Sequence, residues 1–342
     1  MDLTRAVKAE ASRLGFDLVG IAPAVPTAEH ARFAEWLARG FHGRMEYLAR
    51  RPARRMDVRQ VLEDCRSVVV VGLLYNTDEP FSTNLDEPSR GWVSRYAWGD
   101  DYHGLMEKRL RELGAFIEKA DPDEATRSYV DTGPVLEKAL AQAAGLGWIG
   151  KNTCLLNDEL GSFIFLGVVL TTAQLKPDAP AVDQCGSCTL CLQACPTGAL
   201  VEPYVLDARL CISYLTIELK ESIPEELRGE MGRHLFGCDI CQDVCPYNPG
   251  VATTKEEVFT ARPAFLHPIL AELVSWDEEA FLRATRRSPI RRTKFRGFRR
   301  NLAVALGNSA IPEAEALLSE MAEDPDPLVA EHARWGLERR RT

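Results

Sequence analysis

The spacing of the cysteines restricts the fold of this chain more than any other feature. Four of the ten cysteines follow the pattern C-x2-C-x2-C-x3-C-P between Cys185 and Pro196, and three follow C-x2-C-x3-C-P between Cys238 and Pro246. Such short loops present soft thiolates to one side of an iron–sulfur cube, and the last cysteine of a run reaches the neighbouring cluster. The chain is therefore expected to bring two separate stretches together around a pair of 4Fe–4S clusters, which carry electrons one at a time.

This crossing of the last ligand assigns eight thiolates to two clusters. The first cluster is expected to be held by Cys185, Cys188, Cys191 and Cys245. The second run is one cysteine short, so a cysteine between the runs completes the second set, which is Cys195, Cys211, Cys238 and Cys241. Two upstream cysteines, Cys65 and Cys154, are expected to be ordinary buried thiols.

Zinc and disulfides are the alternatives for this cysteine pattern. Zinc also binds pairs of the C-x2-C type, but a run of three thiolates and two endings in Cys-Pro favour iron–sulfur clusters. Disulfides need an oxidising compartment, and nothing in the sequence points to export.

The bulk properties are those of a globular protein of about two or three domains. The chain has 342 residues, 46% of them hydrophobic, and no apolar stretch is long enough to span a bilayer. Its first ten residues form an amphipathic pattern without the apolar core of a signal peptide. We therefore expect a cytoplasmic protein, in a compartment that suits oxygen-sensitive clusters.

A net charge of −9 argues against nucleic acid, but one segment is strongly basic. Between residues 283 and 300 there is no acidic residue, Phe295 and Phe298 are interleaved, and the basic residues are Arg283, Arg286, Arg287, Arg291, Arg292, Lys294, Arg296, Arg299 and Arg300. This basic segment is either a solvated helix face or a surface that binds RNA phosphates.

The part of the chain before residue 177 predicts an α+β fold. Helical patterns cover residues 4–14 and 30–39, and apolar runs typical of buried strands cover 17–22, 67–75 and 162–172. These elements do not alternate regularly, which argues against a doubly wound sheet. Residues 131–134, Asp-Thr-Gly-Pro, are expected to open a helix, and residues 148–152 are expected to form a loop.

The glycines at 145–150 have the spacing of a dinucleotide motif but follow a helix, so the sequence does not indicate NAD. After a linker at 177–180 and the cysteine segment, short helices are expected at 301–306, 312–321 and 327–340, with Asp326 as the N-cap of the last. Paired helices of this kind are typical of a HEAT-like module.

Four further motifs, together with the cysteines, resemble the epoxyqueuosine reductase family, whose members complete queuosine in the tRNA anticodon. They are SRYAWGDDYH at 94–103, DTGPVLE at 131–137, GWIGKN at 147–152 and CISYLTIE at 211–218. The likeness covers nearly the whole chain. It implies a nitroreductase-like cobalamin-binding domain at residues 1–177, a ferredoxin-like double-cluster domain at 178–250, and a connecting segment with a HEAT-like tRNA-binding module at 251–342.

The resemblance also implies two 4Fe–4S clusters and base-off cobalamin, and a relation to reductive dehalogenases. A motif that places a histidine on cobalt is nearly matched at Asp101 and His103, but Met106 occupies its glycine position. We interpret this match as chance, with His103 structural or hydrogen-bonding beside the site.

By the same resemblance, Asp131 is the acid that protonates the epoxide oxygen. An acid in this role works best where burial raises its pKa toward neutrality. The alternative is that Asp131 only caps a helix. The remaining matches are corrinoid contacts at Arg54, Ser94, Tyr96, Leu155 and Ser213, and tRNA contacts at Lys220, Arg291, Arg292, Lys294, Arg296, Arg299 and Arg300.

The predicted reaction converts an epoxide to an alkene with two electrons and two protons and releases water. A flavodoxin or ferredoxin is the expected electron donor, and the enzyme is expected to be a monomer. Two other functions compete: a cytoplasmic corrinoid reductase acting on a small molecule, like a reductive dehalogenase, and a non-catalytic electron-transfer subunit. The large domain before the cysteines counts against the second, and the basic segment counts against the first.

Overall fold

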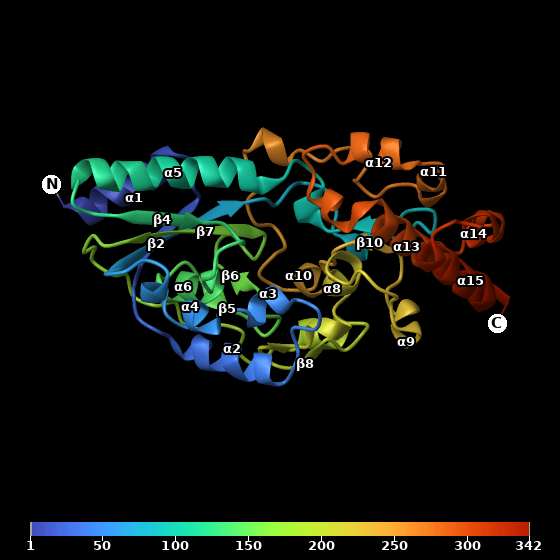
Figure 1. Ribbon diagram of the computed structural model, residues 1–342, viewed down its shortest axis with the longest axis horizontal. Helices are drawn as coiled ribbons and strands as arrows, with labels where there is room; N and C mark the ends of the chain where they lie inside the picture. Colours follow the sequence, from blue (N-terminus) through green and yellow to red (C-terminus); the bar gives the residue numbers. More distant parts are fainter. Residues whose placement is uncertain (1, 342) are drawn as a thin grey trace.

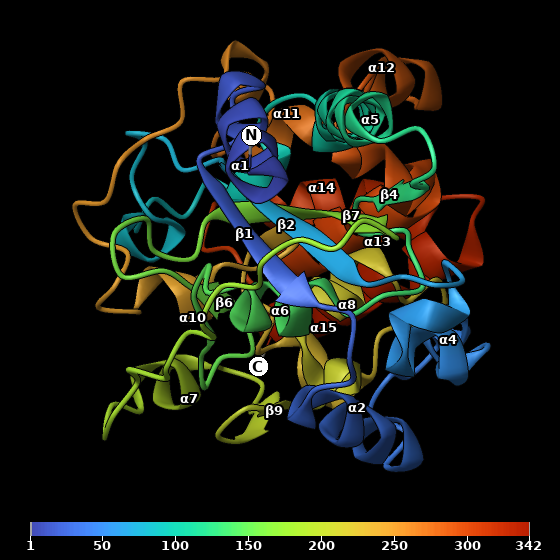
Figure 2. The ribbon, with the colours of Figure 1, turned by 90° about the vertical axis from the view of Figure 1, so that its left-hand side faces the viewer.

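The computed structural model describes residues 2–341 and is centred on an antiparallel sheet (Figures 1 and 2). The strand order is β1-β2-β7-β4, and each neighbouring pair is antiparallel. The strands are β1 (Leu18–Pro23), β2 (Ser67–Leu74), β4 (Thr126–Tyr129) and β7 (Ile164–Thr171). The structure thus confirms a mixed α+β fold, and it places the predicted strands within a residue or two of their expected ends.

Helices cover both faces of this sheet. Helices α1 (Leu3–Arg13) and α5 (Tyr102–Ala120) lie on one face, and α6 (Glu137–Ala143) lies on the other (Figure 2). Side chains alternate along a strand, so Val69 and Val71 pack toward α1 and α5 whereas Val68 and Val70 pack toward α6. This explains why every residue of β2 is buried and why the strand reads as a continuous apolar run.

Two local predictions were wrong. Helix α6 begins at Glu137 with Leu136 as its N-cap residue, so residues 131–134 do not open it. Asp131 instead has a φ of 58°, which is outside the helical region. Residues 148–152 contribute a strand to a short hairpin of β5 (Trp148–Ile149) and β6 (Leu155–Leu156).

The cysteine segment is joined to the rest of the molecule by strand pairing. Its strand β10 (His234–Phe236) pairs in parallel with β3 (Trp92–Val93), far upstream in the chain. The other elements of this part are α7 (Leu190–Ala194), β8 (Leu200–Glu202), β9 (Val205–Leu206), α8 (Ile212–Ile217), α9 (Glu225–Arg228) and α10 (Ile240–Asp243). Between β1 and β2 lie the helices α2 (Ala28–Ala38), α3 (Glu46–Ala49) and α4 (Pro52–Met56).

The C-terminal part is helical and lies at the opposite end from the N-terminus (Figure 1). Its helices are α11 (Leu270–Val274), α12 (Glu278–Ala284), α13 (Lys294–Gly307), α14 (Ala314–Ala322) and α15 (Pro327–Arg341). Asp326 accepts a hydrogen bond of 2.9 Å from the Leu328 amide, which confirms it as the cap of α15. Helix α13 packs against β10 as well as α14 and α15, so the C-terminal core continues into the cysteine segment. Within residues 2–341, no helix has the length and apolarity to cross a membrane.

Candidate active site

The thiols expected to hold the first cluster surround one small cavity. Its wall includes Cys185, Cys188 and Cys191 from the first run and Cys245 from the second, together with Pro246. Between residues 2 and 341, no three His, Cys, Asp or Glu side chains converge as ligands of a single metal ion would. The four thiols instead enclose a volume, which is the arrangement that a multi-iron cluster needs.

The second predicted set also comes together. The Cys238 thiol lies close to Cys211 and Cys195, and the Cys241 thiol lies close to Cys238 and Cys211. Cys154 lies beside Cys241, so it adjoins this set and is half-buried, whereas the sequence predicted an ordinary buried thiol. Its position was missed because 87 residues separate the two cysteines in sequence, and the β5–β6 hairpin brings them together. Cys65 is a buried thiol, as predicted.

The loop between β5 and β6 holds both cysteine runs in place. The Lys151 ammonium donates to the carbonyl oxygens of Gly186 at 2.6 Å and Cys188 at 2.9 Å. The Asn152 amide donates to the Cys241 carbonyl at 3.3 Å. These two side chains were not predicted to have this role, although the GWIGKN motif was the signal that marked them.

A cavity of about 730 Å³ lies next to this loop. We call it the acid cavity because carboxyl side chains line it, namely Glu29, Asp101, Asp131, Glu137 and Glu218. Arg55, His103, Lys138 and Arg292 add basic groups, and the apolar wall is formed by Leu48, Val135, Leu136, Ala139 and Ile149. Ile149 lies in β5, so one short hairpin contacts both the cavity and the cysteine loops.

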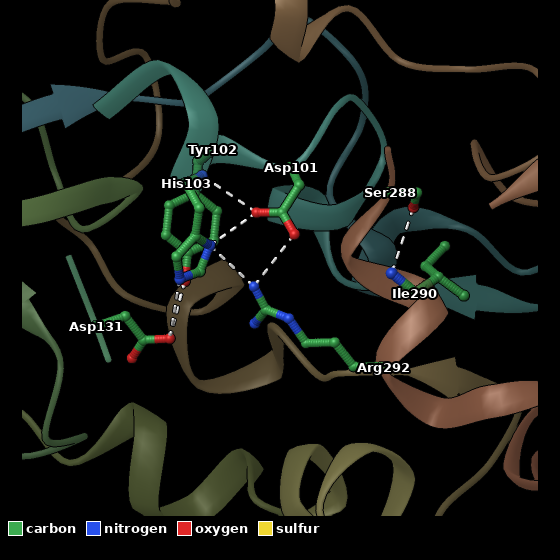
Figure 3. Close-up of polar contacts among 7 residues, drawn as sticks. All are labelled: Asp101, Tyr102, His103, Asp131, Ser288, Ile290 and Arg292. Atoms are coloured by element: carbon green, nitrogen blue, oxygen red, sulfur yellow. Dashed lines mark hydrogen bonds and ion pairs between the residues drawn. The ribbon is translucent and has the colours of Figure 1, made fainter. Parts of the chain in front are cut away.

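Asp131 is positioned by the start of α5. The Tyr102 hydroxyl donates to Asp131 Oδ2 at 3.1 Å, and His103 Nε2 lies 3.8 Å from the same oxygen (Figure 3). Burial raises the pKa of Tyr102, so its hydroxyl keeps its proton and remains a donor. Because α6 starts six residues later, the capping interpretation of Asp131 is wrong. The Asp131 side chain is 60% exposed and faces the acid cavity, where a ligand can cover it.

Asp101 connects Tyr102 and His103 to the C-terminal part of the chain. It caps α5 by accepting from the His103 amide at 3.1 Å, and it lies 2.7 Å from His103 Nδ1. Arg292 approaches from the C-terminal side, 3.3 Å from Asp101 Oδ2 (Figure 3). Burial alone would raise the pKa of Asp101, but the hydrogen bonds from His103 and the charge of Arg292 together lower it. His103 is thus a hydrogen-bonding residue beside the site, as predicted.

Two buried polar atoms at the cavity wall have no partner among the described residues: Arg55 Nε and Glu137 Oε1. The other Arg55 nitrogens donate to the carbonyls of Gly133 and Tyr47 at 3.0 and 3.2 Å. Burial raises the pKa of Glu137 to about 8, and the nearby charge of Asp131 adds to this effect. The raised pKa favours the protonated, neutral form of Glu137 near pH 7. Sequence reasoning missed both residues.

Of the expected corrinoid contacts, Asp131 is the one among the described residues that line this cavity. Asp131 lines it, whereas Arg54 is exposed on α4 and its neighbour Arg55 points inward. The Ser94 hydroxyl donates to the buried Asp239 carboxylate at 2.5 Å. Tyr96 packs between two cores with its ring against Tyr102, Leu155 is buried in β6, and Ser213 is partly buried in α8.

The basic segment divides into an outer and an inner set. Arg291, Lys294 and Arg296 are exposed, although Arg296 pairs with Asp326 at 2.7 Å, and Lys220 is exposed beside them. Arg299 is 13% exposed and pairs with Asp324 at 2.8 Å.

The prediction that Arg300 contacts tRNA is wrong, because its side chain is completely buried. Its guanidinium donates to the carbonyls of Leu215, Leu219 and Glu221, and burial lowers its pKa to about 10. The helical period of α13 turns this position toward the core.

Two protein-family models match the chain. The model described as a 4Fe-4S double cluster binding domain matches residues 184–248, which contain all eight expected ligands. The model described as epoxyqueuosine reductase QueG, DUF1730, matches residues 55–132 and ends just after Asp131.

Curated proteins and solved structures match over nearly the full length. The chain is 42% identical over 336 residues to the epoxyqueuosine reductase of Escherichia coli K12, covering 98% of this chain and 89% of that protein. It is 45% identical over 343 residues to the Pseudomonas aeruginosa enzyme, covering 98% and 94%. A crystal structure of epoxyqueuosine reductase with an epoxyqueuosine-modified tyrosine tRNA stem loop is 32% identical with a TM-score of 0.89, covering 98% and 90%.

Proposed function

Because the chain belongs to the epoxyqueuosine reductase family, we propose that it reduces the epoxide of epoxyqueuosine in the tRNA anticodon to the alkene of queuosine. The observation that carries this proposal is the joining of two sites by one hairpin. Ile149 lines the acid cavity, and Lys151 and Asn152, which follow it, hold the loops of the cluster thiols. A proton-donating cavity therefore adjoins an electron-storing site.

Two 4Fe–4S clusters are the electron carriers, in agreement with the matched double-cluster domain. We assign their ligands as Cys185, Cys188, Cys191 and Cys245 for the first and Cys195, Cys211, Cys238 and Cys241 for the second. Cys245 and Cys195 each leave their own run to reach the other cluster. The crossing keeps the two clusters close enough for electrons to pass singly between them.

The acid cavity fits cobalamin by the chemistry of its wall. An apolar side formed by Val135, Leu136 and Ile149 suits a flat macrocycle. The unpartnered Arg55 Nε and Glu137 Oε1 are a donor and an acid at the same wall, and they suit the amide groups on the rim of a corrinoid. When bound and reduced, this cofactor would supply a cobalt nucleophile strong enough to attack a carbon of an epoxide.

The side chains of this protein then supply protons and orientation. Asp131 protonates the oxygen that leaves the epoxide carbon, and Tyr102 and His103 hold its carboxyl in place. Removal of that oxygen as water consumes two electrons and two protons in all. Asp131 supplies the first proton, and the ligand that fills the cavity excludes bulk water from this exposed side chain.

Several broader features belong to the same proposal. The tRNA binds across the exposed part of the basic segment, at Arg291, Lys294 and Arg296, and at Lys220 beside it, through salt-dependent phosphate contacts. We divide the chain into a cobalamin domain at 1–177, a cluster domain at 178–250 and a HEAT-like tRNA-binding module at 251–342. The enzyme acts in the cytoplasm as a monomer and receives electrons from a flavodoxin or ferredoxin.

The test is a single anaerobic assay with purified protein, reconstituted clusters and cobalamin, and a chemical reductant. An anticodon stem loop carrying epoxyqueuosine should lose the mass of one oxygen atom, and an unmodified stem loop should not change. A set of small epoxides and haloaromatics tests the alternative small-molecule reductase. The proposal fails if the loaded protein leaves the modified RNA unchanged, or if it reduces the small molecules instead.

A further inference from the structure

Arg292 belongs to the basic segment but does not point away from the protein as a phosphate contact would. Its Nη2 atom lies 3.3 Å from Asp101 Oδ2 and 3.0 Å from His103 Nδ1. Its guanidinium carbon lies 5.8 Å from the centre of the Tyr102 ring. Figure 3 shows the guanidinium placed against the residues that contact Asp131. One cation thus touches three consecutive residues at the start of α5.

The main chain of Arg292 is fixed by the C-terminal part of the molecule. Arg292 lies in a short 3-10 helix, η6 (Pro289–Thr293), whose first turn is capped by the Ser288 hydroxyl, 3.3 Å from the Ile290 amide. The Ile290 side chain is fully buried in the C-terminal core. Lys220 donates to the Arg292 carbonyl at 3.2 Å. The position of this guanidinium therefore follows that of the helical module.

Asp101, which Arg292 contacts, is connected to the catalytic acid Asp131 through the next two residues of α5. Asp101 is the N-cap of α5, so its place sets where Tyr102 and His103 begin the helix. The Asp101 amide also donates to the Arg287 carbonyl at 2.7 Å, which gives a second contact with the same C-terminal segment. Tyr102 and His103 in turn contact Asp131. A displacement of Arg292 therefore changes the surroundings of Asp131 through two residues.

Arg292 also bears on which nitrogen of His103 carries the proton. A guanidinium only donates, so a hydrogen bond from Arg292 requires a lone pair on Nδ1 and places the proton on Nε2, facing Asp131. The Asp101 carboxylate, 2.7 Å from the same Nδ1, favours the opposite tautomer, in which Nε2 is an acceptor. Arg292 and Asp101 thus compete for one ring nitrogen, and the outcome decides whether His103 Nε2, 3.8 Å from Asp131 Oδ2, carries a proton or a lone pair.

We propose that Arg292 is a positioning residue for Asp131, acting through Asp101 and His103, and that it couples the C-terminal helical module to the acid cavity. The inference rests on the proposed function, because it takes Asp131 as the proton donor. It reassigns Arg292 from holding RNA phosphate to orienting the acid, and it leaves the phosphate role to neighbours such as Arg291. Binding of RNA to the module then reaches the acid through the Arg292 side chain.

The test compares Arg292→Met with the matched control Arg291→Met in protein carrying oxidised clusters. Nitrogen-15 NMR of the histidine rings reads the tautomer directly, and the chain has only 6 histidines, so a His103→Gln sample assigns the signals. Loss of Arg292 should shift His103 toward the form protonated on Nδ1, because Asp101 is then its partner there. Arg291→Met should leave the His103 signals unchanged.

Kinetics with the modified stem loop give the second readout. Arg292→Met should lower kcat on the order of 10- to 100-fold with little change in RNA affinity, since a small displacement of a catalytic group has effects of that size. Arg291→Met should act mainly on KM. Arg292→Lys should recover part of the lost kcat, because one ammonium replaces the charge but not the planar contact with two residues.

Two results would overturn the inference. One is an unchanged His103 tautomer in Arg292→Met, and the other is a loss confined to RNA affinity, which would make Arg292 a phosphate contact. If Arg292→Met does not fold, the NMR comparison is made with Arg292→Lys, for which an intermediate shift is expected and no shift contradicts the inference. Wild-type protein that fails to reduce the stem loop would defeat the proposed function, whereas the tautomer measurement would still decide whether Arg292 controls His103.

Discussion

The cluster site and the acid cavity are assembled from very different lengths of chain. The expected cluster ligands all fall between residues 185 and 245, and most lie in two short runs. The acid cavity takes its charged residues from Glu29 at one extreme to Arg292 at the other. A site built from local loops leaves a pattern that can be read in the sequence, whereas a site assembled by tertiary packing leaves single residues without a pattern.

The key polar groups of the two regions also differ in their burial and in how firmly they are held. Cys245 is buried, and the loops around it are fixed by donors such as Lys151. Asp131 is mostly exposed and is oriented by only two side chains. A cluster needs rigidly held ligands around a volume that excludes water, whereas an acid must be accessible to a substrate that enters and leaves. Substitutions in the first region should therefore remove a cofactor, and substitutions in the second should alter rates and proton affinities.

The largest expected effect is that of Cys211→Ala in the cluster site. Loss of one predicted ligand should remove the second cluster and leave about half of the iron, with the first cluster intact. Iron and sulfide analysis with EPR of the reduced protein measures this outcome. Cys154→Ala is the matched control, because Cys154 contacts Cys241 but is not an assigned ligand. If Cys211→Ala keeps its full iron content and Cys154→Ala loses iron, Cys154 is the cluster ligand and Cys211 is not.

A smaller effect is expected from Glu137→Gln in the acid cavity. The pKa of Glu137 is raised to about 8 in the folded protein, so its stabilising contribution is present at low pH and is lost as pH rises through about 8. As the pH rises from 6 to 8.5, wild-type protein should lose up to several kcal/mol of unfolding free energy, since one pKa unit corresponds to about 1.4 kcal/mol. The variant should unfold at a higher temperature than wild type at pH 8.5.

The measurement is thermal unfolding of both proteins between pH 6 and pH 8.5, with the clusters kept loaded. The amide of glutamine preserves the shape of the side chain but does not ionise, so a difference in slope with pH reports the carboxyl alone. Parallel curves for the two proteins would show that Glu137 is already ionised at pH 7.

The smallest effect is expected from Tyr102→Phe. The substitution removes the hydroxyl that donates to Asp131 but keeps the ring, which stacks on Phe165 with centroids 4.0 Å apart. A hydrogen bond to a charged group contributes about 1.5 kcal/mol, so turnover should fall about tenfold. Iron and cobalamin content should stay at wild-type levels. A variant that turns over at the wild-type rate would leave His103 as the residue that orients Asp131.

The sequence predicted the parts of this molecule that depend on local pattern. The apolar run at 67–75 became β2, and the thiols of each predicted set lie together. The start of α6 was placed too early because Asp-Thr-Gly-Pro is typical of a helix start, whereas tertiary contacts hold Asp131 at a positive φ. Arg300 was placed on the surface because a run of charges does not show which residues the helix turns inward.

Single side chains of the acid cavity were beyond sequence reasoning for a different reason. Arg55 and Glu137 each lie beside a residue that was named, Arg54 in one case and the 131–137 motif in the other. Only the direction in which each side chain leaves the backbone shows that it reaches the cavity. Periodicity cannot supply that direction in short helices such as α4 and α6.

The central claim is that electrons are stored at the cysteine site and that their use awaits a proton from Asp131. The direct test adds the modified stem loop to anaerobic, cobalamin-loaded protein with pre-reduced clusters and follows the EPR signal of the clusters. In wild-type protein the signal should disappear as the epoxide is reduced, and in Asp131→Asn it should persist with both clusters intact. Oxidation of the clusters by the stem loop at the same rate in both proteins would contradict the account.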